Sequence, residues 1–133
     1  MNTLEIEASI NNWETVLAFI ENTLEAIDCP VSVQNKICIA AEEIFINIAH
    51  YAYKTKGIAS IGVTARNEVT ISFEDEGIPF DPLSKLDPNI RLTADEREIG
   101  GLGIFMAKHL MDDITYRYEG NKNILTIRKE LTP

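Results

Sequence analysis

The sequence predicts an α+β fold, a two-layer α/β sandwich in which helices pack on one face of a mostly antiparallel sheet. Apolar residues recur with period two in some segments and with helical spacing in others. The period-two segments come in pairs joined by short turns, as hairpins do, and the helical segments stand apart from them. The length of 133 residues, 45% of them hydrophobic, is enough for one domain with a real core.

The N-terminal part is expected to hold one strand and two helices. Residues 4–8 alternate apolar and polar side chains, which predicts a strand. Asn12 is a suitable cap for a helix over residues 13–27, where apolar residues recur at helical spacing. Pro30 ends this helix, and a second, longer helix is expected over residues 31–53.

The middle of the chain changes from helical to alternating periodicity. Residues 58–66 and 68–75 alternate on either side of Asn67, which predicts a hairpin. Residues 77–82 are rich in glycine and proline and are expected to form a loop. Residues 84–98 are charged and weakly periodic, so they predict an irregular connection. An irregular loop of this length in a small domain is usually functional or mobile.

The C-terminal part is expected to begin with a glycine cluster and a helix. Residues 100–103 include three glycines and lead into a helix over residues 104–111. Strands are expected over residues 114–119 and 124–130, joined by a turn at Gly120. The predicted order of elements is therefore βααββαββ.

Charge and composition exclude several classes of function. The chain has 12 Lys and Arg against 21 Asp and Glu, a net charge of −9, which argues against binding to nucleic acid or to an anionic membrane. No apolar run reaches the ~18 residues of a membrane span, and the N-terminus lacks the pattern of a signal peptide. Cys29 and Cys38 lack metal-ligand spacing and are interpreted as reduced, core-filling residues. We therefore expect a cytoplasmic protein.

Glu43 and Asn47 are the first candidate functional residues. They lie one turn apart on the long predicted helix and therefore share a face. Their neighbours are almost all apolar, so these two oxygen-bearing side chains are expected to point into a cavity, where they suit a Mg²⁺ ion that keeps several waters. The alternative is a solvated edge of an amphipathic helix. His50 continues the same stripe and is interpreted as an ordinary helix residue.

Asp75 and Gly77 form a second candidate. Val69, Ile71 and Phe73 share one face of their strand, and Asp75 falls on that same face at its end. An inward carboxylate there could accept a hydrogen bond from an exocyclic amine of a ligand. The alternative is an Asx-turn that closes the strand.

The glycine cluster is the third candidate. Gly101, Leu102 and Gly103 precede a predicted helix, and the backbone amides at a helix N-terminus attract phosphate groups. The cluster lacks the lysine of a P-loop and the setting of a dinucleotide-binding fingerprint. A flexible hinge before the helix is the alternative interpretation.

The order of these parts resembles the GHKL (Bergerat-fold) ATPase and kinase superfamily over residues 4–131. Within it, the chain looks most like the small anti-sigma regulatory factors, serine kinases of the RsbW and SpoIIAB type, because of the segments at 79–82, 100–104 and 110–113. The matching segments are the N box from Glu43 to Asn47, the G1 box from Asp75 to Gly77, the G2 box from Gly101 to Gly103, and the ATP lid at 83–99.

The resemblance implies a role for each matching residue. Glu43 would act as general base on a serine of a protein substrate, and Asn47 would hold the Mg²⁺ that bridges the phosphates of ATP. Asp75 would accept a hydrogen bond from the adenine amino group, with Gly77 keeping the backbone close to the base. The phosphates would be cradled by the amides around Gly101, Leu102 and Gly103.

The resemblance also implies partners. The protein that is phosphorylated would be a STAS-type anti-sigma factor antagonist, and the protein that is sequestered would be a sigma factor. The alternative function is a module that binds ATP without turnover. Members of the family often dimerise, which leaves a homodimer open. Relatives commonly have a histidine where this chain has Tyr51; His50 stands one position earlier and either takes over that role or is an ordinary helix residue. In relatives a threonine on the late strand often completes the adenine site, and no residue from Asn123 to Thr126 is assigned to that role. Candidate cations for the phosphates are Arg91, Arg97 and Lys108.

Overall fold

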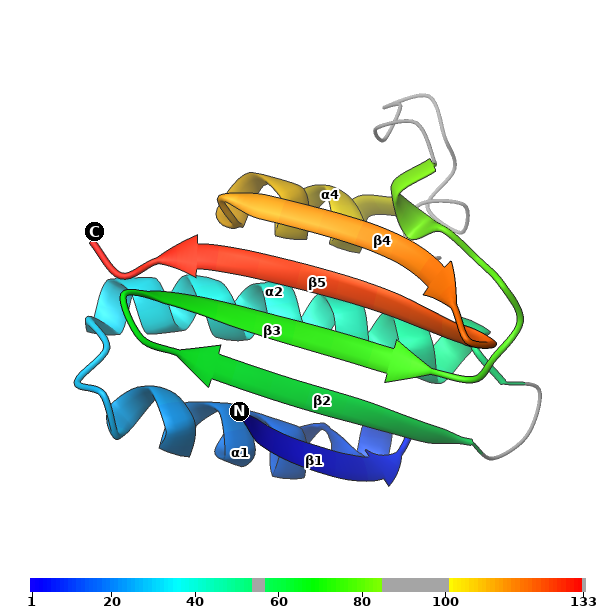
Figure 1. Ribbon diagram of the computed structural model, residues 1–133, viewed down its shortest axis with the longest axis horizontal. Helices are drawn as coiled ribbons and strands as arrows, with labels where there is room; N and C mark the ends of the chain where they lie inside the picture. Colours follow the sequence, from blue (N-terminus) through cyan, green and yellow to red (C-terminus); the bar gives the residue numbers. More distant parts are fainter. Residues whose placement is uncertain (54–56, 85–100, 133) are drawn as a thin grey trace.

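A five-stranded antiparallel sheet forms one layer of the described structure, and helices cover one of its faces (Figure 1). The computed structural model of the chain describes residues 1–53, 57–84 and 101–132. The strands are β1 (Asn2–Glu7), β2 (Ile58–Ala65), β3 (Glu68–Asp75), β4 (Asp113–Glu119) and β5 (Lys122–Glu130). The helices are α1 (Trp13–Glu25), α2 (Val31–Tyr51) and α4 (Gly101–Leu110), with short 3₁₀ turns η1 (Ile10–Asn12) and η2 (Pro82–Ser84). The predicted α+β sandwich is confirmed.

The strand order in the sheet is β1-β2-β3-β5-β4. All four pairings are antiparallel. The last strand, β5, therefore lies between β3 and β4, and its register places Asn123 opposite Asp75. This pairing brings the start of β5 to the end of β3.

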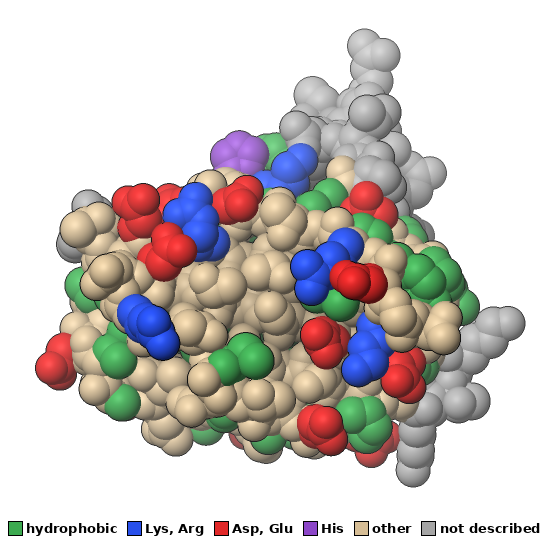
Figure 2. Space-filling view, in the orientation of Figure 1, with side chains coloured by type: hydrophobic (Ala, Val, Ile, Leu, Met, Phe, Trp, Pro, Cys, Tyr) green, Lys and Arg blue, Asp and Glu red, His purple; other side chains and the backbone are tan. Residues whose placement is uncertain are grey.

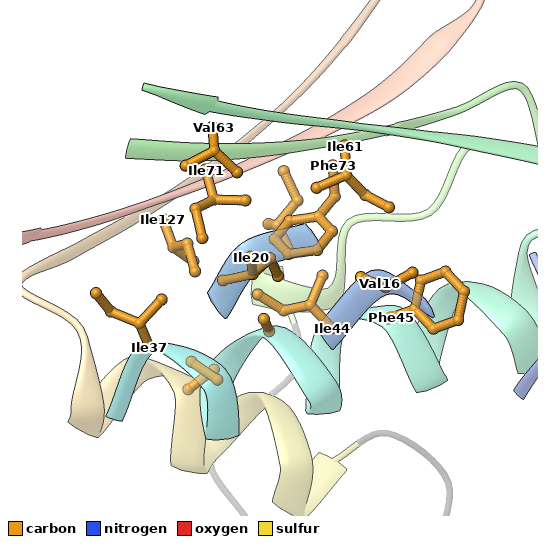
Figure 3. Close-up of a cluster of buried hydrophobic side chains, with 14 of the residues drawn as sticks. Val16, Ile20, Ile37, Ile44, Phe45, Ile61, Val63, Ile71, Phe73 and Ile127 are labelled. Carbon is orange, nitrogen blue, oxygen red and sulfur yellow. The ribbon is translucent and has the colours of Figure 1, made fainter. Parts of the chain in front are cut away.

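The core lies between the sheet and the helices, as Figure 3 shows. Strand β3 alternates strictly, so every second side chain from Val69 onwards faces the helices and the intervening ones face away. Helices α1 and α2 supply the opposite wall. The largest fully buried side chains include Val16, Ile20, Ile37, Ile44, Phe45, Ile61, Ile71, Phe73 and Ile127.

The other face of the sheet carries no helix among the described residues (Figures 1 and 2). Its side chains include hydroxyls, charged groups and a few apolar residues such as Ile58. Ser72 and Thr126 share a hydrogen bond of 3.3 Å on this face, and Arg128 lies 3.0 Å from Glu68. Some of the polar groups on this face therefore pair with one another.

The predicted elements differ from the observed ones mainly at their ends. Helix α2 ends at Tyr51, short of the predicted residue 53, and the Tyr53 hydroxyl bonds instead to the carbonyl of Ile58 at the start of β2. Helix α4 begins at Gly101 and so includes Gly101 and Gly103, two glycines that were predicted to precede it. The predicted turn is confirmed at Gly120 and Asn121, which both have positive φ, as a two-residue hairpin turn of type I′ requires.

Two further sequence expectations concern the long connection and the membrane. The predicted ATP lid at 83–99 lies outside the described residues except for 83 and 84, which belong to η2. Within the described ranges, no helix combines the length and apolar character needed to cross a bilayer.

Candidate nucleotide-binding site

A pocket lies where several elements end; its interior and its open mouth together span about 410 Å³. The C-terminal ends of α2 and β3 meet the N-terminal end of β5 at one end of the molecule (Figure 1). Its walls are mostly apolar with a few polar groups among them, as is usual for small-molecule sites. The lining residues are Ile44, Asn47, Ile48, Tyr51, Ala52, Phe73, Asp75, Ile78, Phe80, Pro82, Tyr116, Asn123 and Leu125.

Asn47 brings an unpaired amide to the wall of this pocket. Its side chain is 9% exposed, and no hydrogen bond joins it to the part of the chain that the structure describes. No fully buried side-chain nitrogen or oxygen in that part lacks a partner, so the amide must reach the pocket surface. At the pocket surface this amide is open to a ligand, an ion or water.

Glu43 lies one turn before Asn47 on α2 and is half-buried. It is not one of the residues that line the pocket. Burial, and secondly the negative charge of Glu42, raise the pKa of the Glu43 carboxyl. The pair predicted from spacing is therefore divided: Asn47 faces the pocket and Glu43 stands beside it.

Asp75 forms the Asx-turn that was the alternative interpretation of its position, and it also lines the pocket. It ends β3 on the helix-facing side and is 6% exposed. Its Oδ1 accepts from the amide of Gly77 at 2.9 Å, which makes an Asx-turn, and from Nδ2 of Asn123 at 2.9 Å. Its Oδ2 has no partner among the described residues. The carboxylate therefore closes the strand and also lines the pocket.

Gly77 packs against the end of α2. A Cβ atom at this position would lie 2.1 Å from the carbonyl oxygen of Ala52. The next amide, that of Ile78, donates to the same oxygen at 3.2 Å. Only glycine allows the turn after β3 to approach α2 so closely. Glycine is therefore required at position 77 by a backbone atom of this chain, the carbonyl oxygen of Ala52.

Asn123 and Tyr116 are pocket residues that sequence reasoning did not assign. Asn123 is 7% exposed and contacts Asp75 and the turn after it. The Tyr116 hydroxyl donates to Oδ1 of Asn123 at 2.5 Å. Thr126, by contrast, bonds to Ser72 on the outer face and is not part of the pocket lining. Once the register of β5 is known, the alternation of its side chains places Asn123 and Thr126 on opposite faces of the sheet.

Tyr51 occupies the wall of the pocket four residues after Asn47. Its ring stacks on Phe80, with ring centroids 6.2 Å apart, and burial raises the pKa of its hydroxyl. His50 is exposed and is not one of the lining residues. Tyr51, and not His50, is therefore the aromatic residue at the end of α2 that lines the pocket.

The predicted glycine cluster opens α4. Gly101, Leu102 and Gly103 form its first turn, where backbone amides have no partner within the helix. This end of α4 points to the end of the molecule that holds the pocket (Figure 1), and α4 contacts α2 and η2. Lys108 is exposed further along α4, whereas Arg91 and Arg97 lie outside the described residues.

The donor set fits a magnesium ion that is held mainly by phosphates and water. The described residues contain no group of three or more acidic, histidine or cysteine side chains able to hold a metal alone. The unpaired amide of Asn47 supplies one oxygen, and the carboxylate of Glu43 lies one turn away. Mg²⁺ usually keeps several waters and binds one or two protein oxygens together with phosphates.

Comparison with known proteins gives one curated relative of nearly equal length. The chain is similar to the serine/threonine-protein kinase BtrW of Bordetella bronchiseptica. The two are 24% identical over 135 residues, which cover 99% of this chain and 95% of that protein.

Two solved structures share the fold. The RsbU and RsbW domains of Rv1364c from Mycobacterium tuberculosis match with a TM-score of 0.66 and 20% identity, covering 100% of this chain and 34% of that one. The histidine kinase AdeS of Acinetobacter baumannii matches with a TM-score of 0.50 and 17% identity, covering 100% of this chain and 70% of that one. At these identities the likeness concerns the fold alone.

The family is given by a match over nearly the whole described fold. Residues 6–129 match the histidine kinase-like ATPase domain. This range runs from β1 to β5 and includes every element that lines the pocket. The chain belongs to the family of histidine kinase-like ATPase domains, which confirms the GHKL resemblance of its sequence.

Proposed function

We propose that this chain is an ATP-dependent serine/threonine protein kinase of the anti-sigma regulatory type. It phosphorylates a STAS-type antagonist and sequesters a sigma factor in the cytoplasm. The observation that carries the proposal is the pocket itself, where the unpaired amide of Asn47 and the unpaired oxygen of Asp75 line one apolar cavity. The similarity to a serine/threonine-protein kinase over 99% of the chain supports the choice of reaction.

The base of ATP is proposed to lie against Asp75. Its Oδ2 accepts a hydrogen bond from the adenine amino group, while Oδ1 is occupied by Gly77 and Asn123. The apolar side chains of Ile48 and Leu125 cover the ring. A hydrogen bond to a charged acceptor contributes about 1.5–3 kcal/mol, enough to select a base that carries an amine.

The phosphates are proposed to lie between α2 and the start of α4. Asn47 binds Mg²⁺, which when bound neutralises phosphate charge. The amides of Gly101, Leu102 and Gly103 donate to phosphate oxygens, where the helix dipole favours negative charge. These local attractions oppose the repulsion that a net charge of −9 exerts on a polyanion.

Glu43 is proposed as the general base. Its carboxylate takes the proton from the serine hydroxyl as that oxygen bonds to the γ-phosphorus, and the bond from the γ-phosphorus to the bridging oxygen breaks to release ADP. A base works best when its pKa approaches the working pH. The raised pKa of Glu43 is a change in that direction.

Phosphorylation of the antagonist would weaken its contact with this chain. A phosphoserine adds about −1.5 to −2 charge. Repulsion from a chain of net charge −9 then favours release of the product. The released antagonist leaves the chain available for the sigma factor.

A second candidate function is a binding module that uses ATP as a conformational ligand without turnover. The position of Glu43 beside the pocket rather than in its lining favours this alternative. In such a module, nucleotide binding changes the affinity for a partner protein, and no phosphate is transferred.

Phosphate transfer to STAS-type antagonists tests the two candidates. The wild type, Glu43→Gln and Glu42→Gln are incubated with Mg-ATP labelled at the γ-phosphate. Glu42 is the matched control, because it is the half-buried neighbour on the same helix. The kinase predicts labelled antagonist with the wild type and Glu42→Gln, and a loss of about 100-fold or more with Glu43→Gln. Nucleotide binding with no labelled antagonist would support the module instead.

A further inference from the structure

Asn123 uses its whole hydrogen-bonding capacity within the protein. Its Nδ2 donates to Oδ1 of Asp75 at 2.9 Å and to the carbonyl of Ile78 at 2.9 Å. Its Oδ1 accepts from the amide of Phe80 at 3.1 Å and from the hydroxyl of Tyr116 at 2.5 Å. A side-chain amide has two N–H donors and two acceptor lone pairs, so no group of Asn123 is left for a ligand.

The orientation of this amide is determined by its neighbours. The backbone amide of Phe80 can only donate, and the carbonyl of Ile78 can only accept. Exchanging the nitrogen and oxygen of Asn123 would place donor against donor and acceptor against acceptor. The observed orientation is therefore the one that satisfies all four contacts, and it points an N–H group at Asp75.

Asp75 is held in turn by two donors on one oxygen. Gly77 and Asn123 both bond to Oδ1, which fixes the rotation of the carboxylate and leaves Oδ2 without a partner among the described residues. A turn formed by Gly77 alone would hold the carboxylate from one side only. Because Asn123 lies directly opposite Asp75 in the sheet register, it holds the second side.

We propose that Asn123, oriented by Tyr116, is the positioning residue that gives this pocket its preference for a base with an exocyclic amine. The proposal rests on the proposed function, since it assumes that a nucleotide occupies the pocket. Asn123 does not touch the ligand. It saturates one oxygen of Asp75, so that the other is presented to the amine in a single orientation.

A purely structural role for Asn123 predicts a different result from a positioning role. Loss of structure would weaken binding of every nucleotide to a similar extent. Loss of positioning would weaken only the nucleotide whose amine contacts Asp75. The ratio of two affinities, one for ATP and one for purine riboside triphosphate, separates these roles, because the second compound lacks only the amine.

The experiment measures this ratio by calorimetry for the full chain, four single variants and one double variant. Asn123→Ser removes the amide, and Tyr116→Phe removes only the hydroxyl that orients it, which keeps the test available if the first variant does not fold. Asp75→Asn removes the charged acceptor. Thr126→Val is the matched control, since it removes a hydrogen bond from the same strand on the opposite face of the sheet.

The wild type is expected to prefer ATP by about tenfold or more. Asn123→Ser and Tyr116→Phe should reduce this preference at least about threefold, and Thr126→Val should keep it. Adding Asn123→Ser to Asp75→Asn should change the ratio no further, because the two residues act through one carboxylate. If Asn123→Ser weakens both nucleotides equally, the positioning role is wrong and the proposed function stands. If the wild type binds neither nucleotide, both are wrong.

Discussion

Asn47 and Asp75 are single polar residues on otherwise apolar faces of their elements. Asn47 and Asp75 are both more than nine-tenths buried and both reach the pocket. Helical spacing and period two are enough to place both residues on the core-facing side of their elements. The residues that contact Asn47 and Asp75 could not be predicted in this way. Periodicity predicts which face of an element a residue lies on, and not which element packs against that face.

Gly77→Ala tests the close contact between the turn after β3 and α2. The new methyl group would lie 2.1 Å from the carbonyl oxygen of Ala52, a backbone atom that cannot move aside cheaply. We expect the free energy of unfolding, measured with urea, to fall by about 2–4 kcal/mol.

Gly62→Ala is the control for this substitution. Its methyl group would meet the sulfur of Met1 at 2.8 Å. Met1 is flexible and 84% exposed, so the change in stability should stay within about 1 kcal/mol. Equal losses in the two variants would show that the Ala52 contact is not what requires glycine at position 77.

Cys38 provides a pH dependence with a defined sign. Burial, then the charges of Glu21 and Glu25 and the neighbouring Cys29, raises the pKa of its thiol from 9.0 to about 11. The folded state therefore holds this proton more tightly than the unfolded state does. Its contribution to stability is complete below pH 9 and is lost as the pH rises from about 9 to 11.

The measurement is the free energy of unfolding at pH 8 to 11 for the wild type and Cys38→Ala. The wild type should lose stability more steeply than the variant between pH 9 and 11. Parallel curves would show that the Cys38 thiol does not cause the loss of stability.

Both cysteines are free thiols in the structure, as the sequence predicted; Cys29 is buried and Cys38 is half-buried.

At the scale of elements, periodicity predicted the helices and strands but not their neighbours. The strands at residues 58–75 and 114–130 were expected as hairpins, and both hairpins are observed. The pairing of β3 with β5 joins residues about 50 positions apart. Local sequence periodicity does not predict a contact between strands so far apart in the sequence. Asn123 was missed for this reason, since its role depends on lying opposite Asp75.

Tyr53 joins three elements just beyond the end of α2. Its hydroxyl donates to the carbonyl of Ile58 at 2.8 Å and accepts from the amide of Glu76 at 2.7 Å. Tyr53→Phe leaves both backbone groups without this partner and should lower the free energy of unfolding by about 1–3 kcal/mol. Denaturation with urea measures it.

Tyr118→Phe serves as the control for the loss of a tyrosine hydroxyl. Tyr118 is 43% exposed, and its hydroxyl has no bond to the described part of the chain. We expect a change of less than about 0.5 kcal/mol. A loss as large as that of Tyr53→Phe would show that the tie between α2, β2 and the turn after β3 contributes nothing of its own.

At the scale of the whole molecule, the sheet and helices bring distant residues to one end. The pocket takes its walls from α2, β3, β4, β5 and the turn at residues 78–82. The fold class, the order of elements and the three motifs could be predicted, because each rests on local spacing. The separation of Glu43 from the pocket lining and the aromatic wall of Tyr51 and Phe80 could not, since both depend on how α2 meets the turn.

The proposed function requires that a nucleotide bind in this pocket through Asn47 and Asp75. The most direct test is the melting temperature with and without Mg-ATP for the wild type, Asn47→Ala, Asp75→Asn and the control Asn35→Ala, an exposed residue of α2. A ligand at about 100 times its Kd adds roughly 2.7 kcal/mol, a rise of several degrees for a domain of this size. We expect this rise in the wild type and Asn35→Ala and its loss in the two pocket variants. No rise in the wild type, or an undiminished rise in the pocket variants, would contradict it.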